Sequence, residues 1–228
     1  MSHEHVLEAV SVTRTLPGPP PTTLVQDVSL GIHPGEFVAV MGPSGCGKSS
    51  LLYLLGLLDR PTHGSVRVDG RAMDALSERE RTAVRLERIG FVFQFHFLLP
   101  ELTAHANVTL PMQRRGLLTK AEIDDRADML MAKLGIEDAA HRRPERMSGG
   151  QRQRVAIARA LANDPAIILG DEPTGNLDSG NTRIVIEEFT RLAHEEGRAV
   201  ICVTHDANVA AAADRRIHML DGRIEKDA

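Results

Sequence analysis

Cysteine is scarce in this sequence, and the two signs of charge are nearly balanced. Among 228 residues only Cys46 and Cys202 are cysteines, and they lie far apart. Two thiols cannot form a disulfide framework or a four-ligand zinc site, so reduced cysteines in the cytosol fit best. The formal net charge of -4 is too small to gather nucleic acid nonspecifically. We therefore expect no nucleic-acid partner.

Long hydrophobic runs are also missing. The longest, residues 51–58, is far too short to span a bilayer. Residues 1–5 lack the cationic stretch and apolar run of a secretory signal, and the pair His3 and His5 favours solvated side chains over a metal site. We expect no direct membrane insertion, so any membrane contact must come through a partner.

The composition and the hydrophobic periodicity of the sequence are those of a globular α/β protein. Hydrophobic residues make up 42% and charged residues 25% of the chain, which is enough to bury a core. Strand patterns flank a central stretch, residues 95–162, in which only helical spacing occurs. In that stretch Thr119 and Glu122 form a capping box, and the helix ends at Gly135. The predicted strands are residues 6–12, 24–32, 37–41, 65–68, 91–93, 167–169, 199–203 and 217–220, and the other predicted helices are 48–58, 77–88, 181–195 and 206–212.

The alternation of strands and helices favours a parallel sheet. Residues 37–41 are apolar throughout, as expected for a strand buried on both faces. The fold class is therefore α/β, a parallel-sheet core with an N-terminal antiparallel β layer and an inserted α-helical subdomain. We predict a single domain, 1–228, in which 1–94 and 163–228 form the β layer and core and 95–162 form the helical subdomain.

A glycine-rich loop between a predicted strand and a predicted helix matches the phosphate-binding loop pattern at every fixed position. The loop comprises Gly42, Pro43, Ser44, Gly45, Cys46, Gly47, Lys48 and Ser49. Its glycines let successive N–H groups point at an anion, to which the helix dipole adds. Lys48 can reach the β and γ phosphates, Ser49 offers a hydroxyl oxygen to magnesium, and Ser50 completes the candidate nucleotide-binding segment.

An acidic pair, Asp171 and Glu172, follows the aliphatic strand 167–169. Adjacent side chains diverge at a strand end, so one carboxylate can approach a metal while the other faces elsewhere. We expect Asp171 to act through magnesium-bound water and Glu172 to orient the attacking water as general base. Alone, such a pair is more often two solvated side chains at a strand end. The phosphate-binding loop upstream makes the catalytic interpretation the favoured one.

A second glycine-containing segment begins at Ser148 and continues through Gly149, Gly150 and Gln151. Ser148 and Gln151 have capping-box spacing, which predicts a helix N-terminus with exposed backbone amides. In isolation this is merely a capped helix. Together with residues 152–156 it closely resembles the signature of ABC ATPases, a family of RecA-like P-loop NTPases. The resemblance implies that this segment closes over ATP bound to a second, identical subunit.

Further positions match the family in order. Gln94 resembles the glutamine that touches magnesium and the attacking water, and Asp178 ends a loop, 175–178, through which family subunits contact each other. His205 resembles the switch histidine at the γ phosphate. With Glu172 and Lys48, we therefore count Gln94 and His205 as catalytic, and with Ser49 and Asp171 we count Gln94 as a metal residue. Each position is weak alone.

The resemblance is imperfect at the position expected to bind adenine. Many family members stack an aromatic ring on adenine, yet no aromatic residue precedes Phe37. Arg14 is the nearest candidate, because a guanidinium plane can stack on a base. Cys46 within the loop is either a passive small residue, the more common case, or an oxidation-sensitive thiol.

Residues 93–104 and the 175–178 loop resemble the branch of lipoprotein-release, macrolide-export and cell-division ATPases, and are most similar to the lipoprotein-release type. Phe95, Phe97, Leu98 and Leu99 either line a groove for a membrane partner's coupling helix or fill the core of the helical subdomain. The resemblance implies a peripheral subunit on the cytoplasmic face of the inner membrane. There it would hydrolyse ATP to drive permease subunits, or signal through a membrane protein as the cell-division type does.

Overall fold

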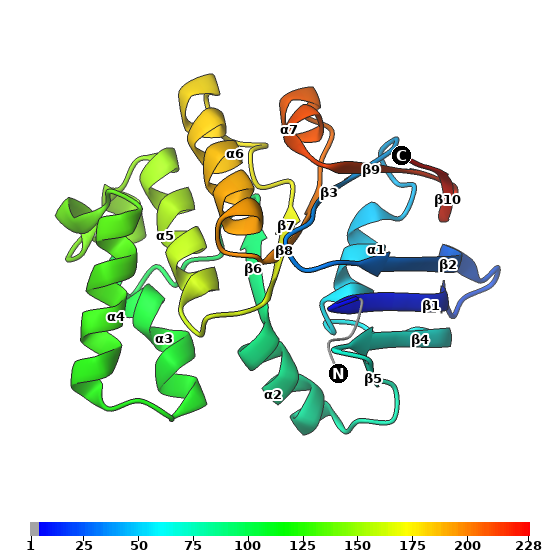
Figure 1. The fold of residues 1–228 in the computed structure, drawn as a ribbon, viewed down its shortest axis with the longest axis horizontal. Coiled ribbons are helices and arrows are strands. Elements are labelled where there is room, and N and C mark those ends of the chain that lie inside the picture. The colour runs from blue at the N-terminus through cyan, green and yellow to red at the C-terminus, as the bar shows by residue number, and fades with distance from the viewer. Residues whose placement is uncertain (1–4) are drawn as a thin grey trace.

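The structure is a computed structural model that describes residues 5–228. The expectations for residues 1–4, namely the missing secretory signal and the pairing of His3 with His5, fall outside the described residues. The described chain forms two sheets with helices between them and beside them (Figure 1).

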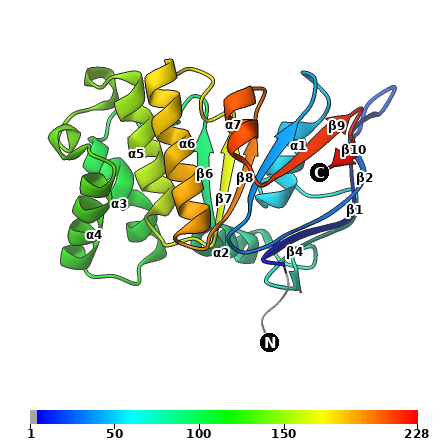
Figure 2. The same cartoon turned by 45° about the horizontal axis from the view of Figure 1, so that its top comes forward.

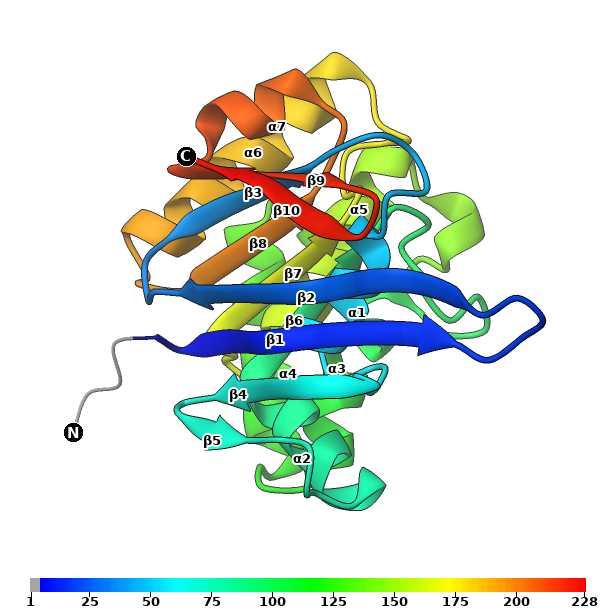
Figure 3. The ribbon, with the colours of Figure 1, turned by 90° about the vertical axis from the view of Figure 1, so that its right-hand side faces the viewer.

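One sheet is antiparallel, with the strand order β2-β1-β4-β5. Its strands are β1 (Leu7–Leu16), β2 (Thr22–Ile32), β4 (His63–Val68) and β5 (Arg71–Ala72). The proline-rich loop 17–21 joins β1 to β2, as expected for residues that cannot donate to a ladder. β2, β1 and β4 lie side by side as one layer in Figure 3. This is the N-terminal β layer.

The second sheet has the order β10-β9-β3-β8-β7-β6, and all its neighbours are parallel except the edge pair β9 and β10. Its strands are β3 (Phe37–Met41), β6 (Ile89–Phe93), β7 (Ile167–Asp171), β8 (Ala199–Val203), β9 (Arg215–Leu220) and β10 (Arg223–Asp227). Val38 and Val40 point into one core cluster, whereas Phe37 and Ala39 point into the other. β3 is thus buried on both faces, which accounts for its uninterrupted apolar sequence.

Helices cover both faces of the parallel sheet. α1 (Lys48–Leu55) lies between the two sheets and buries Leu51, Leu52, Leu54 and Leu55, each worth roughly 1.5–3 kcal/mol when removed from water. α6 (Ser179–His194) and α7 (Ala207–Ala212) lie on the opposite face (Figures 1 and 2). α1 ends three residues before the predicted Leu58, because the chain turns at Gly56 and Leu57, the latter with φ of 58°.

The elements between β6 and β7 are helical, and they lie together at one end of the molecule (Figure 2). They are α3 (Ala104–Arg115), α4 (Lys120–Lys133), α5 (Gly149–Leu161) and the short 3-10 turns Glu137–Ala139 and Pro144–Arg146. Thr119 and Glu122 cap α4 reciprocally, as the sequence predicts. The domain limits at residues 94/95 and 162/163 stay predictions.

Helix α2 (Glu78–Arg88) connects β5 to β6 and begins with a capping box between Ser77 and Glu80. Arg81 is its deeply buried residue, while Val84 is partly buried and packs against the hydrophobic core. Among residues 5–228, we find no helix with both the length and the apolar character needed to cross a bilayer.

Candidate active site

The glycine-rich loop follows β3 and leads into α1, whose N-cap is Gly47 in the left-handed region at φ of 100°. A Cβ atom at Gly47 would come within 2.1 Å of the Leu24 carbonyl oxygen, and one at Gly42 within 2.2 Å of the Met219 carbonyl oxygen. Both positions therefore require glycine. No side chain caps α1 and no acidic residue lies in its first turn, so its N–H groups are open to an anion.

The side chain of Lys48 folds back into this loop. The residue is only 9% exposed, and its Nζ donates to the carbonyl oxygens of Gly42 and Pro43, both at 2.9 Å. Ser44 and Gly45 are exposed at the mouth of the loop, and a Cβ at Gly45 would meet no atom within 4 Å. We expect a phosphate that enters this open loop to meet the Lys48 ammonium.

Asp171, the last residue of β7, faces α1. The Ser49 hydroxyl donates to its Oδ1 at 2.8 Å, and the Tyr53 hydroxyl donates to its Oδ2 at 2.8 Å. These hard oxygens fit a magnesium ion that takes its remaining ligands from water and phosphate. Residues 5–228 contain no cluster of three or more His, Cys, Asp or Glu side chains that could hold a metal without such help.

Tyr53 is a site residue that the sequence interpretation missed. Burial first, and then the hydrogen bond to Asp171, raises the pKa of its phenol to about 12. The phenol is therefore a neutral hydrogen-bond donor at physiological pH. Its position four residues after Ser49 places both side chains on one face of α1, and that spacing is the signal that could have revealed it.

Glu172 turns away from Asp171 because its backbone is left-handed, with φ of 48°. Its N–H donates to the Val203 carbonyl at 2.9 Å, and its Oε2 lies 2.9 Å from His205 Nδ1. The His205 backbone N–H also donates to Oε2, at 3.3 Å. The structure thus brings the predicted base and the predicted switch histidine together, and His205 is 73% exposed at its side chain. β7 and β8 are parallel neighbours, so the residues that follow them meet.

Gln94 follows β6, and its backbone N–H donates to the Asp171 carbonyl at 3.0 Å. Its side chain lies on the 175–178 loop, where Nε2 donates to Asn176 Oδ1 at 3.4 Å. Gly175 permits this approach, since a Cβ there would come within 2.7 Å of Gln94 Nε2. Contact of Gln94 with magnesium stays a prediction.

The signature segment forms the start of α5. Gln151 N donates to the Ser148 hydroxyl at 3.2 Å, and Ser148 N donates to the Gln151 side chain at 3.1 Å, which is the predicted capping box. Gly150 packs so closely on α6 that a Cβ would come within 1.9 Å of Asn181 Oδ1. Asp178 caps α6 by accepting from Asn181 N, and that hydrogen bond lowers the pKa of its carboxyl. Ser148 and Asp178 are both exposed.

Arg14 does not reach the phosphate loop. Its Nε donates to Asp59 Oδ2 at 2.7 Å. Asp59 follows the C-terminal end of α1, and the loop precedes the N-terminal end of this eight-residue helix, about 12 Å away. Stacking of Arg14 on adenine stays a prediction, and it would require this ion pair to open.

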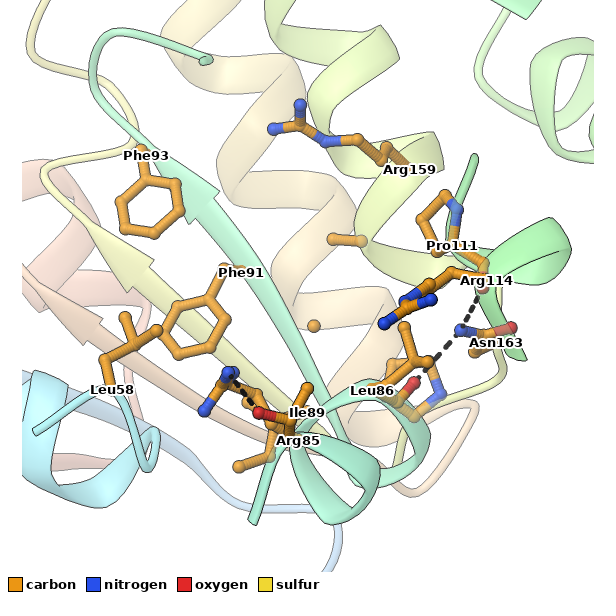
Figure 4. Close-up of a pocket in the computed structure, with 14 residues that line it drawn as sticks. Leu58, Arg85, Leu86, Ile89, Phe91, Phe93, Pro111, Arg114, Arg159 and Asn163 are labelled. Carbon is orange, nitrogen blue, oxygen red and sulfur yellow. Dashed lines mark hydrogen bonds between the residues drawn. The ribbon is translucent and has the colours of Figure 1, made fainter. Parts of the chain in front are cut away.

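An apolar cavity of about 320 Å³ lies where β6, α2, α3 and α5 meet (Figure 4). Leu58, Phe91 and Phe93 line one side, and the two rings stack with centroids 5.4 Å apart. Next to it, Phe95 is 68% and Phe97 61% exposed, and Leu99 is also exposed. Leu98 instead packs against the helical core. Core packing therefore holds for Leu98. Docking of a membrane partner at the exposed residues stays a prediction.

A family profile described as ABC transporter matches residues 25–175, more than half of the chain. The chain belongs to the ABC transporter family. The lipoprotein-releasing system ATP-binding protein LolD 1 of Chlorobium chlorochromatii is 53% identical over 205 residues, covering 90% of this chain and 83% of that protein. LolD of Aquifex aeolicus is 44% identical over 219 residues, covering 96% of each.

Solved structures agree with this assignment. A dimeric structure of the bacterial ABC transporter cassette MJ0796 superposes with a TM-score of 0.91 at 42% identity and covers 97% of each chain. A post-hydrolysis dimer of MJ0796 bound to ADP and Pi gives the same values. The predicted fold class, the ABC family and the enzyme class, an ATP-binding ABC-type ATP hydrolase, are therefore confirmed.

Proposed function

We propose that this chain is the ATP-hydrolysing subunit of a lipoprotein-releasing ABC transporter. The divergence of Asp171 and Glu172 carries the catalytic part of the proposal. One carboxylate is held by α1 beside the phosphate loop, and the other is held by His205 at the end of the next strand. This separates a metal-binding carboxylate from a base. The LolD relatives at 53% and 44% identity support lipoprotein release over cell-division signalling.

In this proposal the loop, with Ser50 following it, and Lys48 grip the triphosphate of ATP. Ser49 and Asp171 would hold magnesium, Asp171 through a bound water, and the ion would supply charge stabilisation at the phosphates. Glu172 orients the attacking water and accepts its proton as water adds to the γ phosphorus and ADP leaves. His205 Nδ1 keeps the Glu172 carboxylate in place, and Gln94 lies at the edge of the same site.

The signature half of the site belongs to a second copy. α5 and α1 lie apart in one chain, with the central sheet between them (Figures 1 and 2). Ser148, at the start of α5, is exposed, and its hydroxyl accepts from Gln151 N. The dimeric structures of MJ0796, one of them bound to ADP and Pi, support a homodimer. In this proposal the homodimer encloses two MgATP. Ser148, Gly149, Gly150 and Gln151 would face the γ phosphate held by the partner, and Asp178 would lie at the subunit contact.

The membrane partner would dock at the exposed apolar residues beside the cavity. Phe95, Phe97 and Leu99 directly follow Gln94, so a permease helix placed there sits next to the nucleotide site. The chain would then be a peripheral subunit at the cytoplasmic face of the inner membrane.

Co-purification tests the transport part of the proposal. We expect the tagged chain, extracted in mild detergent, to retain permease subunits that release a lipid-modified protein from vesicles when ATP is added. Phe95→Asp is expected to lose these subunits, and Met129→Asp, an exposed apolar residue of α4 away from the cavity, is expected to retain them. Unaltered circular dichroism in both variants excludes misfolding. Permease retention by Phe95→Asp, or release that needs no ATP, contradicts the proposal.

A further inference from the structure

No step of the proposed ATP hydrolysis uses Tyr53. It lies on α1 one helical turn after Ser49 and is half-buried. Its hydroxyl donates to Asp171 Oδ2 at 2.8 Å, while the Ser49 hydroxyl donates to Oδ1 at 2.8 Å. Two side chains of one helix therefore hold the two oxygens of one carboxylate, which is itself at the end of a different element, β7.

This arrangement constrains the carboxylate more than either hydrogen bond would alone. A single donor leaves an Asp side chain free to swing about that contact, because its terminal torsion is broad. Two donors on a rigid helix fix the plane of the carboxylate, and hydrogen bonds to an ionised acceptor are about twice as strong as neutral ones. A phenylalanine would fill the same space but would leave Oδ2 without this partner.

We propose that Tyr53 is a positioning residue for the metal side of the site: its hydroxyl engages Asp171 Oδ2 and so keeps Oδ1 directed to Ser49. Tyr53 is not itself a metal ligand. It acts through Asp171, whose oriented Oδ1 is the acceptor for the water that magnesium would carry. The proposal rests on the proposed function for the identity of the metal, but the Tyr53–Asp171 contact exists independently of it.

The chain carries its own probe for this contact. It has no tryptophan and a single tyrosine, so its intrinsic near-ultraviolet emission comes from Tyr53, apart from the weak phenylalanine signal. A phenol that donates to a carboxylate emits weakly, because the acceptor draws the proton in the excited state. We expect low tyrosine emission from the native protein and a rise of about two-fold in Asp171→Asn, whose neutral amide is a poorer acceptor. Tyr53→Phe should show no tyrosine emission at all.

The positioning role is tested with Tyr53→Phe in the full chain. Loss of one charge-assisted hydrogen bond at a half-buried site predicts a rise of about 10-fold in the magnesium concentration for half-maximal hydrolysis. ATP affinity measured in EDTA should change less than about two-fold, since Lys48 and the loop are unchanged. Thr109→Val is the matched control: it removes a buried hydroxyl that donates to the Ala106 carbonyl in α3, and it should leave the magnesium dependence unaltered.

The outcomes separate the two proposals. Unchanged emission in Asp171→Asn, or an unchanged magnesium requirement in a folded Tyr53→Phe protein, overturns the role of Tyr53. If the native protein hydrolyses no ATP under any metal, the proposed function fails. The emission comparison still decides whether Tyr53 engages Asp171 in that case.

Discussion

The N-termini of α1 and α5 both carry glycine, at the N-cap in α1 and at the first helical position in α5. Both lack acidic residues in the first turn, yet they are capped differently. α1 begins at Gly47 with no side-chain cap, and Lys48 closes the loop in front of it. α5 begins at a complete capping box between Ser148 and Gln151. One end is built to hold an anion within its own chain. The other is stabilised by its own side-chain cap, at which Ser148 is exposed.

In the proposed dimer this difference gives the two helix ends different roles. A capped and exposed helix end has no anion to bind in its own chain, but its dipole still favours negative charge. The phosphate loop differs, because Lys48 is buried within it while Ser44 and Gly45 are exposed at its mouth. We therefore expect the two half-sites to complement each other across the two subunits of the proposed dimer.

The largest effect is expected on ATP turnover, from a change at Glu172, the proposed general base. Glu172→Gln keeps the shape of the side chain but cannot accept the proton of water, so ATP turnover should fall by about 10²- to 10⁴-fold. The variant should retain ATP and accumulate as a dimer, visible by gel filtration with ATP. Steady-state phosphate release at the native rate would remove Glu172 from the role of base.

A second prediction concerns the cradle alone. Lys48→Ala removes the ammonium from the loop, and the lost charge-assisted hydrogen bonds should weaken ATP binding by about 10- to 100-fold. Titration of the monomer with a fluorescent ATP analogue measures this. Native affinity in this variant would mean that the loop amides bind the triphosphate without help from Lys48.

The matching change in the signature half should behave differently. Ser148→Ala removes the α5 cap and should lower the free energy of unfolding by about 1 kcal/mol. ATP affinity of the monomer should stay within about two-fold of native, because Ser148 lies apart from the phosphate loop of its own chain. ATP-dependent dimerisation, in contrast, should weaken by about 5- to 30-fold. The same titration combined with analytical ultracentrifugation separates the two quantities. A large loss of monomer affinity would contradict the assignment of this segment to the partner's ATP.

The smallest effect is expected on stability, from a change at Glu196, where α4 contacts the segment that follows α6. Burial disfavours the Glu196 carboxylate, but hydrogen bonds from Lys133 of α4, Arg191 and Arg198 outweigh this and lower its pKa from 4.5 to about 2. A lowered pKa in the folded state stabilises the protein above pH 4.5, and this contribution is lost as the pH falls toward 2.

Glu196→Gln should therefore lower the melting temperature at pH 7 by the equivalent of at most about 1 kcal/mol, since the network is partly solvated. The difference from the native protein should shrink as the pH falls below 4.5. Thermal melts across this range measure it. A difference that stays constant down to pH 3 would exclude ionisation of Glu196 as its cause.

Local patterns in the sequence predicted most of the site. The phosphate loop, the Asp171–Glu172 pair and the Ser148 capping box are each short segments in which backbone conformation and chemistry are set by adjacent residues. The contact of Glu172 with His205 was not predicted, because it depends on β7 and β8 being neighbours in the sheet, and strand order is not a local pattern.

Contacts between distant elements could not be predicted in this way. Arg14 of β1 pairs with Asp59, which follows α1, and no sequence pattern predicts this contact. The spacing of Ser49 and Tyr53 places both on one face of α1, but the hydrogen bond to Asp171 depends on how α1 packs against β7. Helix α3 was not separated within the helical stretch, because Pro111 interrupts its pattern. β10 was missed because its charged sequence, Arg223–Asp227, has no apolar alternation at the sheet edge.

The most direct test of the split site mixes two variants that are each inactive in opposite halves. Lys48→Ala retains its signature, and Ser148→Arg, with a bulky charge at the lid, retains its cradle. In an equal mixture about half of the dimers are mixed and each contains one intact site, so turnover should rise to as much as about a quarter of the native rate. If the mixture shows only the mean of the two separate rates although mixed dimers form, ATP is hydrolysed within one chain and the account is wrong.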